Sequence, residues 1–267
     1  MQVKKSKRDV SDSVLNGSIE KALDVLACFA SADSELGVSE VSRRLGLGVS
    51  TVHRLLNRMM AKGFVRQNPV TQRYGLGWRV VEIAAGMLRN DDITAVSLPY
   101  LTQLRDATGE TARLHVLVGP VRVCLAQVES HSEIRAGGGV GKQYPLYSGA
   151  ASKVILASMP EEQIAKVLRQ LPVTPLGPNM ITDPADMRRE LKAVRSAGYA
   201  VSHSENSVDG TSVAAPVRDF TGAVVAALAL TGPSSRLTAD RCAELSRVVR
   251  DAAAQVSRRL GDGARPE

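Results

Sequence analysis

A basic segment without acidic residues is the first place where this chain could do chemistry. Between positions 41 and 81 the sequence holds eight basic residues and no aspartate or glutamate: Arg43, Arg44, Arg54, Arg58, Lys62, Arg66, Arg73 and Arg79. A solvated helix face normally mixes both signs of charge, whereas each carboxylate here would repel a phosphate backbone and reduce counterion release. The segment therefore favours a polyanionic partner over an ordinary solvated surface, and we expect that partner to be double-stranded DNA.

The helix expected from position 50 to position 62 suits the major groove. Its apolar residues recur at helical spacing, so its opposite face presents Thr51, His53, Arg54, Asn57 and Arg58. Guanidinium and carboxamide groups have the shapes that read guanine and adenine edges, which suits Arg54 and Asn57. Ser50 and Thr51 begin the helix, where free N–H groups can hold a backbone phosphate. His53 has no second metal ligand at helical spacing, so we interpret it as a DNA contact.

Neighbouring elements must position this helix. A shorter helix, 39–45, stops at Gly46, and a Gly-Leu-Gly turn joins it to the helix at 50. Two short strands, 64–66 and 73–76, then enclose a turn that contains Pro69. Two helices followed by a basic hairpin predict a winged helix-turn-helix over residues 18–77, preceded by a flexible segment, 1–17. Its expected DNA contacts are Arg43, Ser50, Thr51, His53, Arg54, Asn57, Arg58, Arg66 and Arg73.

A second domain is expected beyond a linker helix at 78–92. The stripe formed by Trp78, Val81, Ala85 and Leu88 suits either a dimerisation seam or simple core packing within the domain. From residue 93 to residue 267 the pattern alternates amphipathic helices with strands, and a hairpin joins the last two strands. Glycine and small residues at 148–151 open a helix there, so its free N–H groups could be approached by a carboxylate. We therefore expect an α/β (α+β) chain of two domains.

Enzymatic, metal-binding and membrane functions find no support in the sequence. The run GGGVGK would need glycine at Ala136 and a hydroxyl residue at Gln143 to form a phosphate loop, and neither a GxSxG nor an HExxH motif occurs. The three cysteines are isolated among apolar residues, which is typical of buried free thiols. No apolar stretch is long enough to cross a bilayer, and the N-terminus lacks a signal-peptide core. We expect a cytoplasmic protein without catalytic residues, metal, cofactor or membrane partner.

The motifs also occur in a familiar order. The runs SIEKALDVLACFA, VSEVSRRLGLGVSTVHRLLNRMMAKGFVRQ and RYGLGWRVVEIA resemble the N-terminal half of an IclR-family transcriptional regulator. The later runs GETARLHVLVGPVRVCLAQVES, YPLYSGAASKVILAS, GYAVSHSE and SVAAPVRDFTGAVVAALALTGPSSRLT agree with the second half of that family. The resemblance covers about residues 18–260. The basic residue that the family often carries before the recognition-helix Ser-Thr is Val49 here, which removes one phosphate contact.

The resemblance implies a GAF-like effector-binding domain over 93–267 and assembly as a homodimer or homotetramer. Carried across by motif, it implicates Ala150, Ala151, Ser202, Thr211, Val213, Ala229 and Thr231 in binding a small organic acid. Several positions that are polar in relatives are alanine or valine here, which suggests a less polar ligand, such as an aromatic or short aliphatic acid. A one-residue insertion near 205–210 leaves open whether Ser202 or His203 faces the pocket.

We therefore expect a ligand-controlled regulator, most simply a repressor, that binds operator DNA. The alternative is a small-molecule-processing enzyme fused to a DNA-targeting domain. The absence of a nucleophile or acid/base constellation speaks against that alternative.

Overall fold

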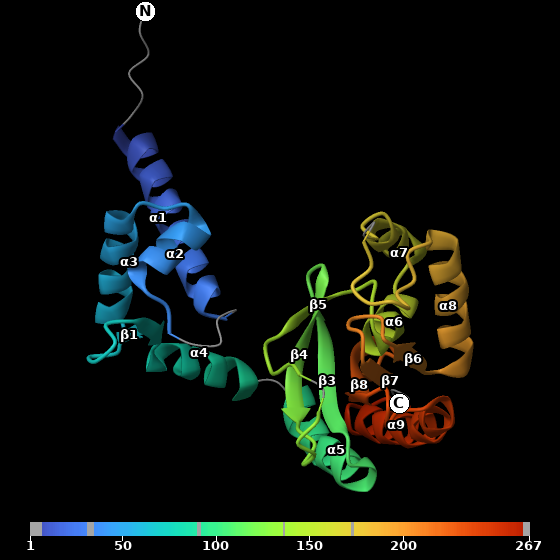
Figure 1. Cartoon of the computed structure of the whole chain (residues 1–267). Helices are drawn as coiled ribbons and strands as arrows, with labels where there is room; N and C mark the ends of the chain where they lie inside the picture. Colours follow the sequence, from blue (N-terminus) through green and yellow to red (C-terminus); the bar gives the residue numbers. More distant parts are fainter. Residues whose placement is uncertain (1–6, 31–34, 90–91, 136, 172–173, 264–267) are drawn as a thin grey trace, which may run out of the picture. The chain divides into compact units, whose positions relative to one another are not determined.

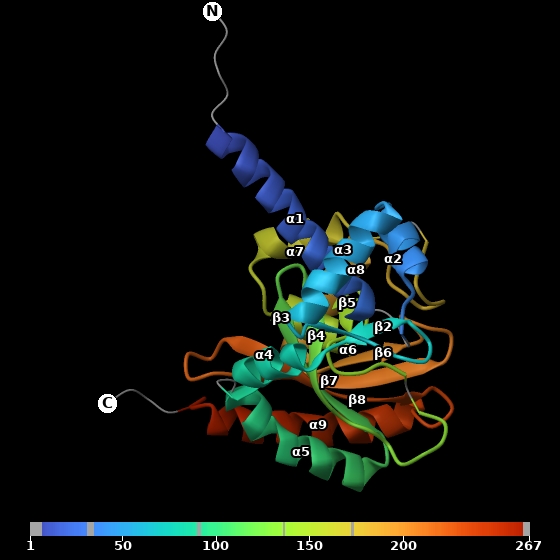
Figure 2. The same cartoon turned by 90° about the vertical axis from the view of Figure 1, so that its left-hand side faces the viewer.

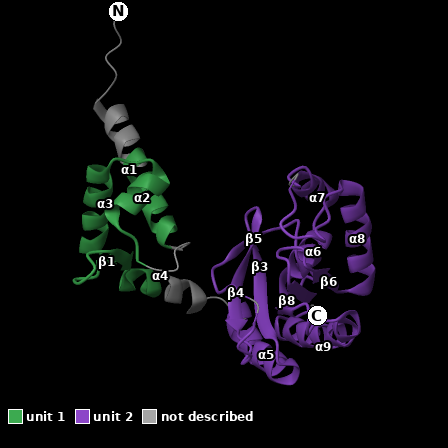
Figure 3. Ribbon diagram, in the orientation of Figure 1, with its two compact units in different colours: residues 1–90 green, residues 91–267 purple. Residues whose placement is uncertain are grey.

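Two compact units make up the chain. The computed structural model describes residues 7–30, 35–89, 92–135, 137–171 and 174–263. The first unit comprises residues 1–90 and the second residues 91–267 (Figure 3). None of the described helices combines the length and apolar character needed to cross a membrane.

The first unit is a winged helix-turn-helix, as predicted. Its elements in chain order are α1 (Lys7–Ala30), α2 (Val38–Leu45), α3 (Val49–Ala61), β1 (Val65–Gln67), β2 (Tyr74–Leu76) and α4 (Trp78–Arg89). The antiparallel wing strands pair Val65 with Leu76 and Gln67 with Tyr74. Apolar residues from α1, α2, α3 and both strands form one core, in which Val25, Val41, Val52 and Leu56 are fully buried.

Helix α1 begins earlier than the sequence indicates. The winged helix-turn-helix was expected to begin at residue 18, but its first helix already starts at Lys7, so Ser18 lies inside it. Residues 7–16 contain neither proline nor glycine, so nothing in them interrupts the helical hydrogen bonding. Of the segment 1–17, for which we expected flexibility, residues 1–6 lie outside the described residues.

The turn between α2 and α3 depends on glycine. Gly46 adopts a left-handed conformation with φ of 64°, and its N–H donates to the carbonyl of Ser42. Residues with a Cβ rarely adopt this conformation, which explains why α2 ends here. Helix α3 starts at Val49, directly after Gly48, so it begins one residue before the expected position and has Ser50 in its first turn.

The second unit contains a sheet of six antiparallel strands in the order β5-β4-β3-β8-β7-β6 (Figure 1). The strands are β3 (Thr111–Val118), β4 (Val121–Val128), β5 (Gln143–Pro145), β6 (Ala200–His203), β7 (Gly210–Arg218) and β8 (Val224–Pro233). The helices are α5 (Asp92–Thr108), α6 (Ala150–Ala157), α7 (Glu161–Leu168), α8 (Pro184–Ala197) and α9 (Ala239–Arg259).

Helices cover both faces of this sheet. Helices α5 and α9 lie side by side against one face (Figure 2), where they pack on Ala112, Leu114, Val213 and other strand residues. Helices α6, α7 and α8 share a second core with Ala214 and Ala229 on the opposite face. Because side chains alternate along a strand, β3 directs Leu114 to the first face and Arg113 and His115 to the second. The face of the sheet that α6 covers therefore carries polar side chains next to its apolar core.

Candidate functional site

Helix α3 presents a polar face to solvent. Val52 and Leu56 are fully buried, whereas His53, Arg54, Asn57 and Arg58 are exposed, in agreement with the helical periodicity. The Nδ2 of Asn57 lies 3.4 Å from the Nδ1 of His53, so these two side chains adjoin on consecutive turns. Thr51 is half-buried and Ser50 is exposed at the start of the helix.

Flanking acids neutralise half of the basic segment. Glu40 forms ion pairs with Arg44 and Arg73, at 2.9 and 2.8 Å, and Glu35 lies 3.5 Å from Arg66. Arg79 pairs with Glu82 at 2.8 Å. Within the described ranges, no carboxylate lies within ion-pair distance of the other four basic residues, Arg43, Arg54, Arg58 and Lys62. Three of these four belong to α3 or directly follow it, so the unneutralised charge gathers on that helix.

The two wing arginines differ in their surroundings. Arg73 donates from Nε to the carbonyl of Glu35 and from Nη2 to the carboxylate of Glu40, so it joins the wing to α2. The side chain of Arg66 is 62% exposed. Glu35 also accepts hydrogen bonds from Asn68 and Thr71 in the turn of the wing. The sequence placed both arginines at the DNA but did not reveal that Arg73 has these intramolecular partners.

A cavity of about 520 Å³ opens on the α6 face of the sheet in the second unit, and we call it the basic cavity. It brings together five of the seven residues expected to bind an effector: Ala151, Ser202, Thr211, Ala229 and Thr231. Of the two alternatives that the sequence left open, Ser202 lines the cavity and His203 does not. The walls also contain Arg113, His115, Arg122, Arg135, Lys142 and Tyr144, none of which the sequence indicated.

The remaining two expected effector residues do not line the basic cavity. Val213 packs in the core beneath α9, on the opposite face of the sheet. Successive side chains of a strand point to opposite faces, so its neighbour Ser212 faces the cavity instead. Ser212 pairs with Ser202 and Thr231 and takes the place expected for Val213. Ala150 is fully buried in the core of α6. These two residues therefore lie outside the basic cavity, whereas the other five line it.

The start of α6 is partly occupied by the chain itself. The N–H of Gly149, which has φ of 91°, donates to Oε2 of the buried Glu205 at 3.0 Å. The second oxygen of Glu205 accepts from the buried Lys153 at 2.6 Å. Among the described groups, none accepts the N–H of Ala150 or Ala151. The helix therefore retains open donors, but one fewer than its sequence implied.

Arg122 is the central cation of the basic cavity. Only 5% of this residue is exposed, and its Nε donates to Oγ of Ser152 at 2.6 Å. Its Nη1 lies 2.9 Å from Nδ1 of His115, and its guanidinium stands 4.2 Å from the ring centroid of Tyr144. In the part of the chain that the structure describes, Arg122 forms no ion pair. Burial lowers the pKa of Arg122 to about 10, so it stays charged at neutral pH.

His115 is held neutral next to this cation. Its burial, together with the charges of Arg122 and Arg113, keeps the pKa of His115 well below its ordinary value. A neutral imidazole has a nitrogen lone pair that can accept from Nη1 of Arg122, whereas an imidazolium would only donate. The pair therefore adds a single positive charge to the basic cavity.

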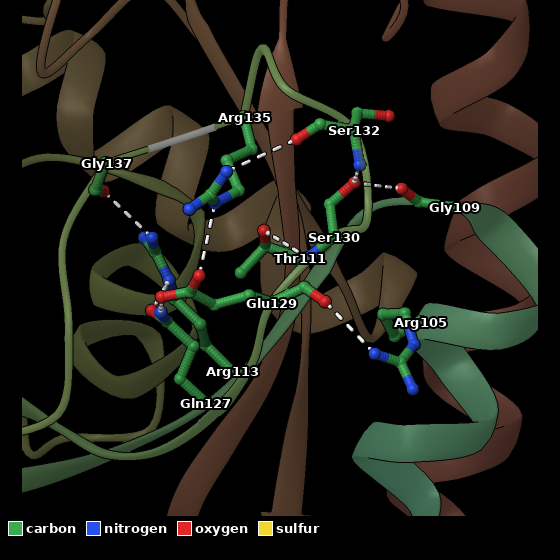
Figure 4. Close-up of polar contacts among 10 residues, drawn as sticks. All are labelled: Arg105, Gly109, Thr111, Arg113, Gln127, Glu129, Ser130, Ser132, Arg135 and Gly137. Carbon is green, nitrogen blue, oxygen red and sulfur yellow. Dashed lines mark hydrogen bonds and ion pairs between the residues drawn. The ribbon is translucent and has the colours of Figure 1, made fainter.

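The loop that follows β4 closes one side of the basic cavity. Figure 4 shows Arg113 between Gln127 and the carbonyl of Gly137, with distances of 2.7 and 2.8 Å. The Glu129 carboxylate accepts from Gln127 and from Arg135, while its carbonyl accepts from Arg105 of α5. These contacts fix the loop both to the sheet and to α5.

A signal for the missed cations exists in the sequence. In TARLHV, Arg113 and His115 alternate with apolar residues, so both must point to the same face of the strand. Polar residues at alternate positions are also typical of a strand with one solvated face. Only the helices that cover this face distinguish a buried cationic wall from an exposed surface.

Comparisons with known proteins agree with this architecture. Residues 18–69 match the IclR helix-turn-helix domain, and residues 85–258 match the bacterial transcriptional regulator IclR C-terminal domain. The chain belongs to the IclR family. It is thus a DNA-binding transcriptional regulator, as its sequence motifs predicted, in a family of regulators rather than of enzymes.

Three relatives illustrate the similarity of this IclR-family chain to known proteins. The HTH-type transcriptional repressor AllR of Escherichia coli strain K12 is 30% identical over 93% of this chain and 92% of its own length. The crystal structure of the Thermotoga maritima IclR is 30% identical, covers 92% of this chain and 99% of that one, and has a TM-score of 0.75. An IclR homologue from Microbacterium hydrocarbonoxydans, complexed with 4-hydroxybenzoate, is 25% identical over 91% of this chain and 98% of its own, with a TM-score of 0.81.

Proposed function

We propose that this IclR-family regulator is a repressor whose affinity for operator DNA is controlled by a small organic acid that binds in the basic cavity. The name of its Escherichia coli relative contains the word repressor, and the Microbacterium homologue is complexed with an aromatic acid, which supports an acid as the effector. In this proposal the exposed face of α3 enters the major groove, where Arg54 and Asn57 contact base edges. Phosphates are contacted by Arg43, Arg58 and Arg66.

The buried Arg122 carries the assignment of the acid. A guanidinium that has lost its water is costly unless an anion or a set of acceptors compensates it. Ser152 and His115 accept two of its hydrogen bonds, but neither brings negative charge. A ligand carboxylate at the cavity face of Arg122, close to the open N–H of Ala151, would supply that charge in charge-assisted hydrogen bonds. This is the start of the helix at 148–151, where the sequence predicted that a carboxylate could approach free N–H groups.

Calorimetry on the full chain tests this proposal. We expect at least one member of a panel of small carboxylic acids, which includes 4-hydroxybenzoate, to bind the wild type and to raise its unfolding midpoint. Arg122→Met should abolish that binding, whereas Arg188→Met, on the exposed side of α8, should leave it unchanged. If Arg122→Met does not fold, Ala151→Asp provides the same test, because its carboxylate would occupy the site. Undiminished binding to a folded Arg122→Met or Ala151→Asp variant would refute the cavity as the effector site.

We further propose a homodimer or homotetramer. Trp78 is 78% exposed, and Val81 and Ile83 are also exposed on α4, which supports an intermolecular seam more than packing within the unit. Ala85 and Leu88 of the expected stripe have side chains outside the described residues. A two-fold assembly places two α3 helices on a palindromic operator. Light scattering should give a dimer or tetramer, and a monomer that protects a single half-site would contradict this assembly.

A further inference from the structure

The basic cavity carries more positive charge than one carboxylate can balance. Its walls contain four cationic side chains, Arg113, Arg122, Arg135 and Lys142, but only one acidic side chain, Asp209. His115 adds no charge, because its pKa is well below the ordinary value. The Asp209 carboxylate accepts the N–H of Ser234, so it is engaged with the backbone. Glu129, outside the wall, pairs with Arg135 at 3.1 Å.

The cations differ in depth. Arg122 is almost completely buried, and its contacts are neutral: Ser152, His115 and the ring of Tyr144. Its Nη2 donates to no acceptor among the described residues. That nitrogen would lie 3.1 Å from a Cβ on Gly149, so it is next to the open start of α6. This buried end of the cavity suits one carboxylate.

A second cation marks the exposed end. Lys142 is exposed, and its Nζ lies 5.7 Å from the ring centroid of Tyr144, the same ring that Arg122 contacts. No ion pair of Lys142 occurs within the described ranges. Because both cations contact one aromatic ring, a short ligand that lies along that ring can reach both. An ammonium on a flexible stem can follow a second carboxylate without a fixed geometry.

We propose that the effector is a short dicarboxylic acid, with one carboxylate at Arg122 and the start of α6 and the other at Lys142. This inference rests on the proposed function, because it concerns the same cavity. It replaces the expectation of a less polar ligand, which was based on alanine and valine positions alone. Those small residues, Ala151 and Ala229, provide room for the body of the acid, whereas the charge of the walls selects its ends.

Matched ligand pairs test the number of charges that the cavity recognises. The probes are succinate, glutarate and terephthalate, each compared with its monoamide, which keeps the shape and loses one charge. Calorimetry on the full chain at constant ionic strength should show that one diacid binds about tenfold more tightly than its monoamide, since a charge-assisted hydrogen bond is about twice as strong as a neutral one. Lys142→Gln should remove most of this preference. Lys192→Gln, an exposed lysine on α8 outside the cavity, should preserve it.

Three results would overturn the inference, and they are distinguishable. If the monoamides or simple monocarboxylic acids bind as tightly as the diacids, the cavity recognises one carboxylate, and the proposed acid-controlled function stands without the dicarboxylate. If no acid of either kind binds, both the inference and the proposed effector site are wrong. A diacid preference that survives in Lys142→Gln would also contradict the assignment of the second carboxylate.

Discussion

At the scale of residues, the basic segment separates into arginines with intramolecular partners and arginines without them. Arg54 is exposed on α3, and no acid within the described ranges lies at ion-pair distance from it. The spacing of apolar residues was sufficient to predict that it faces outward. Its lack of an ion-pair partner could not be predicted, because Glu35 and Glu40 reach the segment only through the fold of the wing.

We expect Arg54→Ala to relax sequence preference as well as weaken binding. Loss of a bidentate contact to a guanine edge costs about 1–3 kcal/mol at one base pair. Fluorescence anisotropy with the operator and with single-base variants should therefore show smaller differences between sequences for Arg54→Ala than for the wild type. Lys62→Ala, at the end of α3, is the matched control and should weaken binding to all sequences equally. Unchanged discrimination in Arg54→Ala would remove this residue from base reading.

The neutral His115 predicts a pH dependence of stability. Its pKa in the folded state is well below the unfolded value of about 6.5, so below that pH the unfolded chain binds more protons than the folded chain. The free energy of unfolding should therefore fall as the pH decreases below about 6.5, by at most about 1.4 kcal/mol per pH unit from this group. Urea unfolding between pH 5 and pH 7.5 should show a smaller slope for His115→Gln. An identical slope in the two proteins would mean that His115 is protonated in the folded state.

The residues of the basic cavity could be predicted from the sequence only in part. Five of the seven residues that the family resemblance implied for effector binding line the cavity: Ala151, Ser202, Thr211, Ala229 and Thr231. Val213 does not, because a shift of one residue in a strand moves a side chain to the other face. The cationic side chains of the cavity walls, such as Arg113 and Arg122, could not be predicted for a related reason. Whether a strand residue is buried depends on the helices that pack on its face of the sheet, and these helices are distant in sequence.

At the scale of elements, local patterns were sufficient for most boundaries. The linker helix expected at 78–92 is observed as α4 (Trp78–Arg89), because its apolar residues recur at helical spacing. The start of α1 was not predictable in this way, since residues 7–16 contain neither proline nor glycine to mark where the helix begins. The anchoring of the wing by Arg73 also required the folded unit, because its partners are 33 and 38 residues away.

This anchoring gives the two wing arginines different expected phenotypes. Arg73→Ala removes the contacts to Glu40 and to the carbonyl of Glu35, so it should destabilise the first unit by about 1 kcal/mol. Arg66→Ala removes only a 3.5 Å contact of an exposed side chain, so the stability should change little while the DNA affinity falls. Thermal unfolding and DNA titrations of both variants measure the two effects separately. A lower midpoint for Arg66→Ala than for Arg73→Ala would contradict the assignment.

At the scale of the whole molecule, an effector regulates only if its binding free energy depends on the state of the DNA-binding unit. The loop at the basic cavity is tied to α5 through Arg105 and Glu129, and α5 is the first helix of the second unit. A change in this loop on ligand binding could therefore be transmitted to the helix nearest in sequence to the DNA-binding unit. Coupling of about 1–3 kcal/mol, or about 5- to 150-fold in affinity, is typical of such switches.

The most direct test of acid-controlled DNA binding is the operator affinity of the full chain with and without a saturating acid identified by calorimetry. We expect the acid to weaken operator binding about 5- to 150-fold in the wild type and to leave it unchanged in Arg122→Met. An acid that saturates the basic cavity and leaves the operator affinity of the wild type unaltered would contradict the account.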